Sequence, residues 1–128
     1  MEERDIFLKE FRGNPIGEIS EQTSSDELFQ NQVLRPILKL QNDIFVASFI
    51  NYLVKNRIDF SSFSIEKKLV LIENSVQKDI KFRNALKGMV IALFTLDEYA
   101  LYIKNSSSLN KRMMGMLIER LKSQVQLF

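Results

Sequence analysis

A basic stretch, KDIKFRNALKG at residues 78–88, contains the residue types that bind phosphates. It places four cations around one aromatic residue, Phe82, within eleven residues. Cationic side chains neutralise the phosphates of a nucleic-acid backbone, so one hypothesis is a nucleic-acid-associated module that uses the basic C-terminal half. The cations that would contact the nucleic acid are Lys78, Lys81, Arg83, Lys87, Lys111 and Arg112.

Helical geometry separates the cations of this stretch. At about 100° per residue, Phe82 falls in an apolar stripe with Leu86, while Lys81 and Arg83 fall on opposite sides of that stripe. They do not make a single row along which a phosphate backbone would run. We interpret the stretch as a corner capped by Asp79 and followed by a packed helix, and nucleic-acid binding is therefore not the favoured function.

A second hypothesis is a small ligand binder, or an enzyme without histidine, with a pocket between helices. The chain has no histidine and no cysteine, which excludes zinc hydrolases and the Ser-His-Asp and Cys-His mechanisms. It also lacks a glycine-rich phosphate loop. We expect no metal, no cofactor and no catalytic residue. The polar side chains that could line such a pocket are Arg35, Tyr52, Tyr99 and Arg112.

Two pairs of carboxylates were considered for acid and base chemistry. Glu66 and Glu73 are seven residues apart on one helix face, and Asp97 is adjacent to Glu98 in the first turn of an expected helix. Negative charge in a first turn complements the helix dipole. We assign structural roles to both pairs and lean towards a protein that is not an enzyme.

Composition bounds the fold and the location. A chain of 128 residues with 45% apolar content suits one domain with its own core. The longest apolar stretch, residues 44–54, is far shorter than the roughly 20 residues that span a bilayer, so we expect no membrane association. The acidic opening Met-Glu-Glu-Arg-Asp does not resemble a secretory signal, and we expect a cytoplasmic protein.

Charge is distributed unevenly along the chain. Residues 1–64 contain 7 basic and 10 acidic residues, whereas residues 65–128 contain 11 basic and 6 acidic residues. The basic half could attract an anionic partner. We favour the simpler interpretation, in which an acidic half packs against a basic half within one chain or between two chains.

Helical spacing of apolar residues runs through almost the whole chain, without the alternation typical of strands. We predict an all-α, single-domain bundle of about five to six helices. Residues 1–23 form a first helix and a long loop or arm, and residues 24–128 form the bundle core. Pro36 either interrupts a helix or occupies the first turn of the next one. Helix starts are expected at four capping residues, Ser24, Ser64, Asp79 and Thr95.

Two segments carry more apolar surface than one core-facing stripe requires. Residues 44–54 are apolar on almost every side, which is typical of a bundle centre or a subunit interface. The last helix has a core stripe around Leu117 and a second stripe about 120° away. The second stripe is interpreted as core, as a homo-oligomer interface or as a groove for another ligand. Its residues are Leu109, Met113, Met116 and Leu127.

Three stretches, LQNDIFVASFINYLV, VQKDIKFRNALKGMVIALFTLDEY and SSSLNKRMMGMLIERLKSQ, together resemble a small bacterial family of all-helical proteins with no established function. Some members of that family carry an automatic glyoxalase label. The resemblance covers most of the chain, implies an all-helical fold and supplies no active-site motif. Metal-dependent glyoxalases need strands and histidine or glutamate ligands, and this sequence offers neither strand patterns nor histidine.

The favoured prediction is a non-catalytic interaction or structural protein. Simple two-fold dimers are the commonest soluble oligomers, so a homodimer is expected, with a different protein partner as the alternative. The interface would be formed by the last helix or by the helix that contains residues 44–54.

Overall fold

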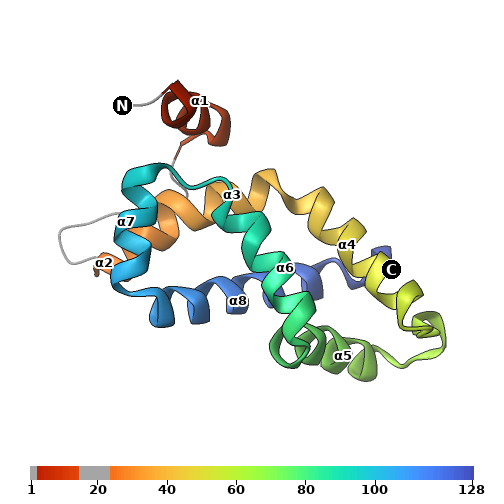
Figure 1. Cartoon of the computed structure of the whole chain (residues 1–128). Coiled ribbons are helices and arrows are strands. Elements are labelled where there is room, and N and C mark those ends of the chain that lie inside the picture. The colour runs from red at the N-terminus through yellow and green to blue at the C-terminus, as the bar shows by residue number, and fades with distance from the viewer. Residues whose placement is uncertain (1–2, 15–23) are drawn as a thin grey trace.

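Every regular element is a helix in the computed structural model, which describes residues 3–14 and 24–128 (Figure 1). The prediction of an all-α bundle is confirmed, although the described residues form eight α-helices rather than five or six. The predicted loop at residues 15–23 lies outside the described part of the chain. The α-helices are α1 (Glu3–Arg12), α2 (Ser25–Phe29), α3 (Arg35–Leu40), α4 (Asn42–Lys55), α5 (Ile65–Lys78), α6 (Ile80–Ile91), α7 (Leu96–Lys104) and α8 (Ser106–Ser123). Shorter helical turns are η1 (Gln30–Leu34), η2 (Phe60–Ser62) and η3 (Val125–Leu127).

The helix count exceeds the prediction partly because Pro36 divides a continuous helical path. It lies in the first turn of α3, as one of the two sequence interpretations required. In an unbroken α-helix its ring would collide with the carbonyl group four residues earlier. The preceding turn, η1, is instead a π-helix in which the amide of Arg35 donates to the carbonyl of Gln30. This wider turn carries the chain past the proline without ending the helical path.

The predicted capping residues begin their helices as expected. The side chains of Ser24, Ser64 and Asp79 each accept a hydrogen bond from the amide three residues later, at 3.1 to 3.2 Å. Thr95 forms a complete capping box: its hydroxyl accepts from the Glu98 amide at 3.2 Å, and the Glu98 carboxylate accepts from the Thr95 amide at 2.8 Å. These local bonds fix where α2, α5, α6 and α7 start.

One core extends through the bundle and receives buried side chains from η1 and α3 as well as from α4, α5, α6 and α8. The helix α6 crosses in front of α8 in Figure 1. The aromatic centre of the core is Phe49, whose ring lies 5.7 Å from that of Phe60 and 4.9 Å from that of Phe128. The predicted core residue Phe82 is partly buried and stacks on Tyr52 at 4.5 Å. Aromatic pairs at these distances contribute beyond the area that they bury.

Other helices of the same chain cover most of both apolar stripes of the last helix. The helix α8 packs against α5 and α6 and also against η1 and α7. Leu109 and Met113 are consequently buried, Met116 is partly buried, and only Leu127 is exposed. Of the three interpretations of this stripe, core is the correct one for Leu109 and Met113, and an oligomer interface is wrong for these two residues because a single chain buries them.

The helix α1 stands apart from the rest of the bundle in Figure 1. Polar groups attach it to the turn between α6 and α7. Arg4 donates to the carbonyl groups of Phe94 and Ala92, at 2.9 and 2.7 Å. The carboxylate of Asp5 accepts from the amide of Leu96 at 3.2 Å. We call these contacts, together with an ion pair between Arg12 and Glu98, the α1 clamp.

Candidate functional site

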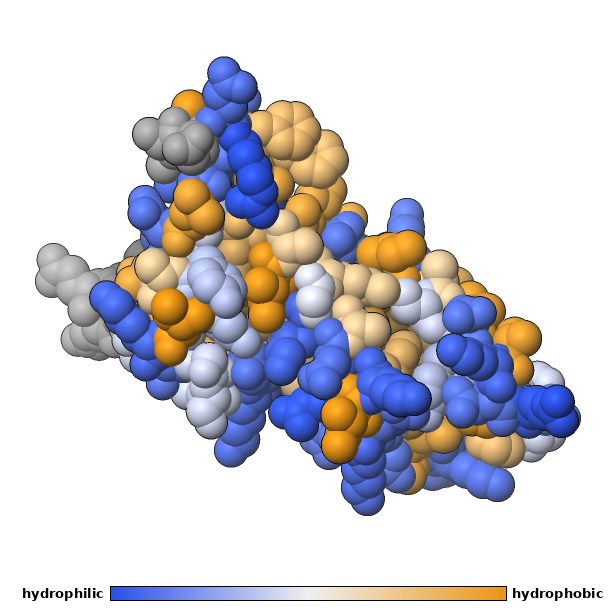
Figure 2. Space-filling view, viewed as in Figure 1, coloured by the Kyte–Doolittle hydropathy of each residue, from blue (hydrophilic) through white to orange (hydrophobic). Residues whose placement is uncertain are grey.

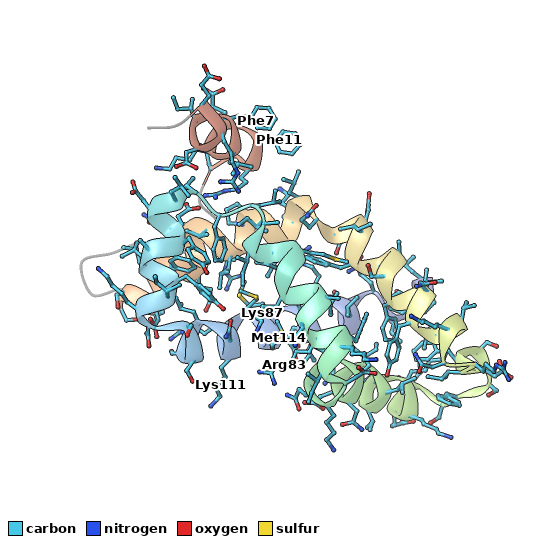
Figure 3. The ribbon with its side chains drawn as sticks, in the orientation of Figure 1. Phe7, Phe11, Arg83, Lys87, Lys111 and Met114 are labelled. Carbon is cyan, nitrogen blue, oxygen red and sulfur yellow. The ribbon has the colours of Figure 1, made fainter. Side chains whose placement is uncertain are left out.

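The six cations of the nucleic-acid hypothesis do not assemble into one surface. Arg83, Lys87 and Lys111 lie on one face of the molecule, where α6 passes in front of α8 (Figure 3). None of these three side chains forms an ion pair in the part of the chain that the structure describes. The tertiary structure thus places Lys111 of α8 on the same face as Arg83 and Lys87 of α6, which helical geometry within one segment could not show.

The other three cations lie elsewhere. Lys78 is exposed at the end of α5, and Lys81 lines a separate groove between α4 and α6. Arg112 points towards α2 and η1, where its Nη1 donates to Gln30 at 2.9 Å and its Nε lies 4.0 Å from a carboxylate oxygen of Asp26. The predicted set of six is therefore corrected to a strip of three.

The four predicted pocket residues are spread over three grooves. Tyr52 lines the groove between α4 and α6, of about 490 Å³, and Tyr99 lines another between α1 and α7, of about 500 Å³. Arg35 and Arg112 meet in a third groove of about 820 Å³, between α3 and α8. Of the four candidates only Arg35 and Arg112 converge, and the two tyrosines do not join them because they lie on helices that line other grooves.

A residue that the sequence analysis missed completes the third groove. Arg120 lies two helical turns beyond Arg112 on α8 and lines the same groove as Arg35. Burial, together with the positive charge of Arg35, lowers the pKa of the Arg120 guanidinium. The spacing of the two arginines along α8 was visible in the sequence, but the approach of Arg35 from α3 was not. We call this feature the arginine groove.

Two of the four carboxylates with the spacing for acid and base chemistry have structural partners. Glu98 completes the capping box of α7 and pairs with Arg12. Glu73 lies 3.6 Å from the Nζ of Lys122 and so links α5 to α8. In the described residues no cluster of acidic side chains could hold a metal ion.

The pKa values of the Tyr52 and Tyr102 hydroxyls are both raised. Burial, together with the charge and hydrogen bond of Asp79, raises the pKa of Tyr52. Burial also raises the pKa of Tyr102, and the hydrogen bond that it donates to Asn110, at 2.5 Å, only partly offsets that effect. Both hydroxyls stay neutral at physiological pH.

One side of α4 is apolar and uncovered. The inward side buries Phe45, Phe49 and Leu53, whereas Ile44, Ile50 and Val54 are 46%, 41% and 71% exposed. Figure 2 shows apolar surface along the edge of the molecule that α4 forms. We call this side the α4 outer face, and its exposed residues are Asp43, Ile44, Ala47, Ile50, Asn51, Val54 and Lys55.

No helix in the described residues is both long enough and apolar enough to cross a membrane. Comparison with known proteins adds no function to these surfaces, because no family model, curated protein or solved structure matches the chain.

Proposed function

We propose that this protein is a non-catalytic interaction protein that works as a homodimer, and that two copies pair through their α4 outer faces. The observation that supports this proposal is the row of exposed apolar side chains at Ile44, Ile50 and Val54. A helix that is apolar on a solvent-facing side is typical of a partner-binding surface. The sequence offered two candidate interfaces, the last helix and the helix that contains residues 44–54. Because α8 is largely covered within one chain, the α4 outer face is the candidate that remains.

The order of residues on the α4 outer face favours a second copy as its partner. Ile44 and Val54 are equally distant from Phe49 along the helix, and so are Asp43 and Lys55. If two α4 helices cross antiparallel about a two-fold axis near Phe49, Asp43 meets Lys55 of the other copy. Isologous two-fold interfaces require this kind of self-complementarity.

A parallel arrangement would lose this match. It would bring Asp43 next to Asp43 of the other copy and Lys55 next to Lys55, and like charges at an interface are destabilising. Within the described residues neither side chain has an ion-pair partner of its own chain. Between the charges, Ala47 presents only a methyl group, which allows close approach of two helices.

Sedimentation equilibrium tests the proposal. We expect the wild-type protein to be a dimer and Ala47→Glu to be a monomer with an unchanged helical circular dichroism spectrum. Asp43→Lys and Lys55→Asp should each weaken the dimer about 5-fold or more, since each juxtaposes like charges, and the double variant should recover most of the affinity. Val70→Lys on α5, which also replaces an exposed apolar residue, serves as the matched control.

A monomeric wild-type protein at about 100 μM, or a double variant as weak as its single parents, would rule out the antiparallel α4 dimer. Such a result would turn the α4 outer face into a candidate surface for a different protein. If Val70→Lys weakened the dimer as much as Ala47→Glu does, that result would also contradict the antiparallel α4 dimer.

A nucleic-acid-associated role is the second candidate, supported by the strip of Arg83, Lys87 and Lys111. Three phosphate contacts to a single strand give a slope of about −2 for the logarithm of the binding constant against the logarithm of salt concentration. Fluorescence anisotropy with a labelled single-stranded RNA at low salt measures this slope. Absence of binding, or binding that persists when all three residues are changed to alanine, would eliminate this candidate.

A further inference from the structure

We propose that the arginine groove binds a small organic phosphate, with Arg35, Arg112 and Arg120 as the phosphate ligands and an apolar floor beneath the rest of the molecule. This site is independent of the α4 outer face and of the cationic strip on α6 and α8. The sequence alone had brought together only two of its arginines, and without a ligand class.

Two of the arginines, Arg35 and Arg120, line the same groove and neither forms an ion pair in the described part of the chain. Arg35 uses its Nε to donate to Asn31 at 2.9 Å, and its two terminal nitrogens have no hydrogen-bond partner among the described residues. The guanidinium of Arg120 likewise has no acceptor or ion-pair partner in that part of the chain, and the positive charge of Arg35 acts on it. A bound anion would accept these free donors and relieve the repulsion between the two cations.

The ligand that best fits this donor arrangement is a phosphate group. Guanidinium groups bind phosphate oxygens in a planar, bidentate manner, and several of them together can hold a dianion. Glu119 also lines the groove but forms no ion pair within the described residues, and Asp26 lies beside Arg112, so the three guanidinium groups face two carboxylates and keep a net positive charge. The net positive charge favours an anion, and the paired donors of the guanidinium groups favour the several oxygens of a phosphate.

The third arginine is held in place before any ligand arrives. Arg112 donates to Gln30 and lies beside Asp26, which leaves its Nη2 free. At the end of the groove, Gln124 exchanges two hydrogen bonds of 2.8 Å with Asn42 at the start of α4. Side chains that are fixed in advance lose less conformational freedom when they bind.

The floor of the arginine groove is apolar. It contains Leu38, Met116 and Gly115, and a Cβ atom built at Gly115 would meet nothing within 4 Å. The glycine therefore leaves open space at its position in the groove lining. A volume of about 820 Å³ lies in the range of small-molecule sites. A phosphate that carries an aromatic or aliphatic group would place that group on this floor.

Titration of the full-length protein with phenyl phosphate, followed by chemical shifts in NMR spectra, tests the site. We expect saturable shifts at groove residues and affinity about tenfold higher for phenyl phosphate than for inorganic phosphate or phenol, since each of these lacks one half of the ligand. Arg120→Gln and Arg35→Gln should each weaken binding about tenfold or more.

Gly115→Leu provides a second, independent variant that leaves all three arginines in place. It should abolish phenyl phosphate binding by filling the groove, while a leucine in a helix interior should not destabilise the fold. Gly88→Ala on α6 is the matched control, because this glycine also lies within a helix and also has open space around it. It should bind phenyl phosphate as the wild type does.

The proposal is overturned if shifts do not saturate below about 10 mM phenyl phosphate, which is weaker binding than a preformed ionic site should give. It is equally overturned if Gly115→Leu binds as the wild type does, or if the arginine variants retain full affinity. Inorganic phosphate that binds as tightly as phenyl phosphate would reject the apolar floor as part of the site.

Discussion

Arg12 and Glu98 lie 86 residues apart in the sequence and form a two-pronged ion pair, with Nη1 to Oε1 at 2.5 Å and Nη2 to Oε2 at 2.6 Å. Their side chains are only 4% and 11% exposed. Arg12 also donates to the carbonyl of Leu93 at 3.0 Å, and its Nε is buried without a partner in the described residues. The pair joins α1 to α7 and is a largely buried part of the α1 clamp.

Replacement of Glu98 by glutamine should release α1. Glutamine can still complete the capping box with Thr95, so the variant removes only the negative charge. Breaking a buried ion pair lowers the free energy of unfolding by about 3–5 kcal/mol when the structure cannot adjust. Here α1 can detach, so the loss cannot exceed the free energy with which α1 docks on the bundle. Amides of α1 should lose protection from hydrogen exchange, while those of α8 keep theirs. Glu119→Gln, which removes an unpaired exposed carboxylate, should leave α1 protected; undiminished protection in Glu98→Gln would contradict the prediction.

Acid should weaken the α1 clamp through Glu98. Burial acts to raise the pKa of this carboxyl group, but the hydrogen bonds and charge of Arg12 and the hydrogen bonds of Thr95 outweigh it and lower the pKa below its usual 4.5. A carboxyl group whose pKa is lower in the folded state contributes stability that is complete above the unfolded pKa and is lost as the pH falls through the folded pKa. Protection of α1 should therefore be constant above about pH 5 and decline below pH 4.5, with a flatter profile in Glu98→Gln.

Met113 distinguishes a core from an interface. Because the residue is completely buried in a single chain, Met113→Ala should lower the free energy of unfolding by about 2–5 kcal/mol. The loss should be the same at different protein concentrations, whereas a residue at a subunit interface would cause a concentration-dependent loss. Denaturant unfolding of wild type and variant at two protein concentrations shows whether Met113 is a core residue or an interface residue. Leu127→Ala, an exposed residue of the same predicted stripe, should cost less than about 0.5 kcal/mol.

Arg57 is a site where a single substitution should stabilise the protein. Its φ of 54° lies in the left-handed region, which costs a residue with a side chain about 1–2 kcal/mol. Arg57→Gly removes this cost and should raise the free energy of unfolding by up to about 1 kcal/mol, after the greater entropy loss of glycine is included. Gly13, with a φ of 83°, offers the opposite test, since Gly13→Ala should destabilise the end of α1. Thermal unfolding measures both changes, and a less stable Arg57→Gly would contradict the strain argument.

The capping residues and the all-helical fold could be predicted from the sequence because they depend on neighbours a few positions away. Ser64 and Asp79 each bond to an amide three residues ahead, and the register of apolar side chains along α5 and α6 is equally local. The corner in KDIKFRNALKG and the exclusion of histidine- and cysteine-based chemistry follow from residue types alone.

Only the tertiary structure decided which surfaces are shared by distant segments. Arg35 and Arg120 line one groove, and Arg12 pairs with Glu98, because the path of the chain brings α3 to α8 and α1 to α7. The same path covers Met113 and leaves Val54 in solvent. Helical periodicity states that a residue belongs to an apolar side of its helix, but it holds no information about which helix, if any, lies against that side.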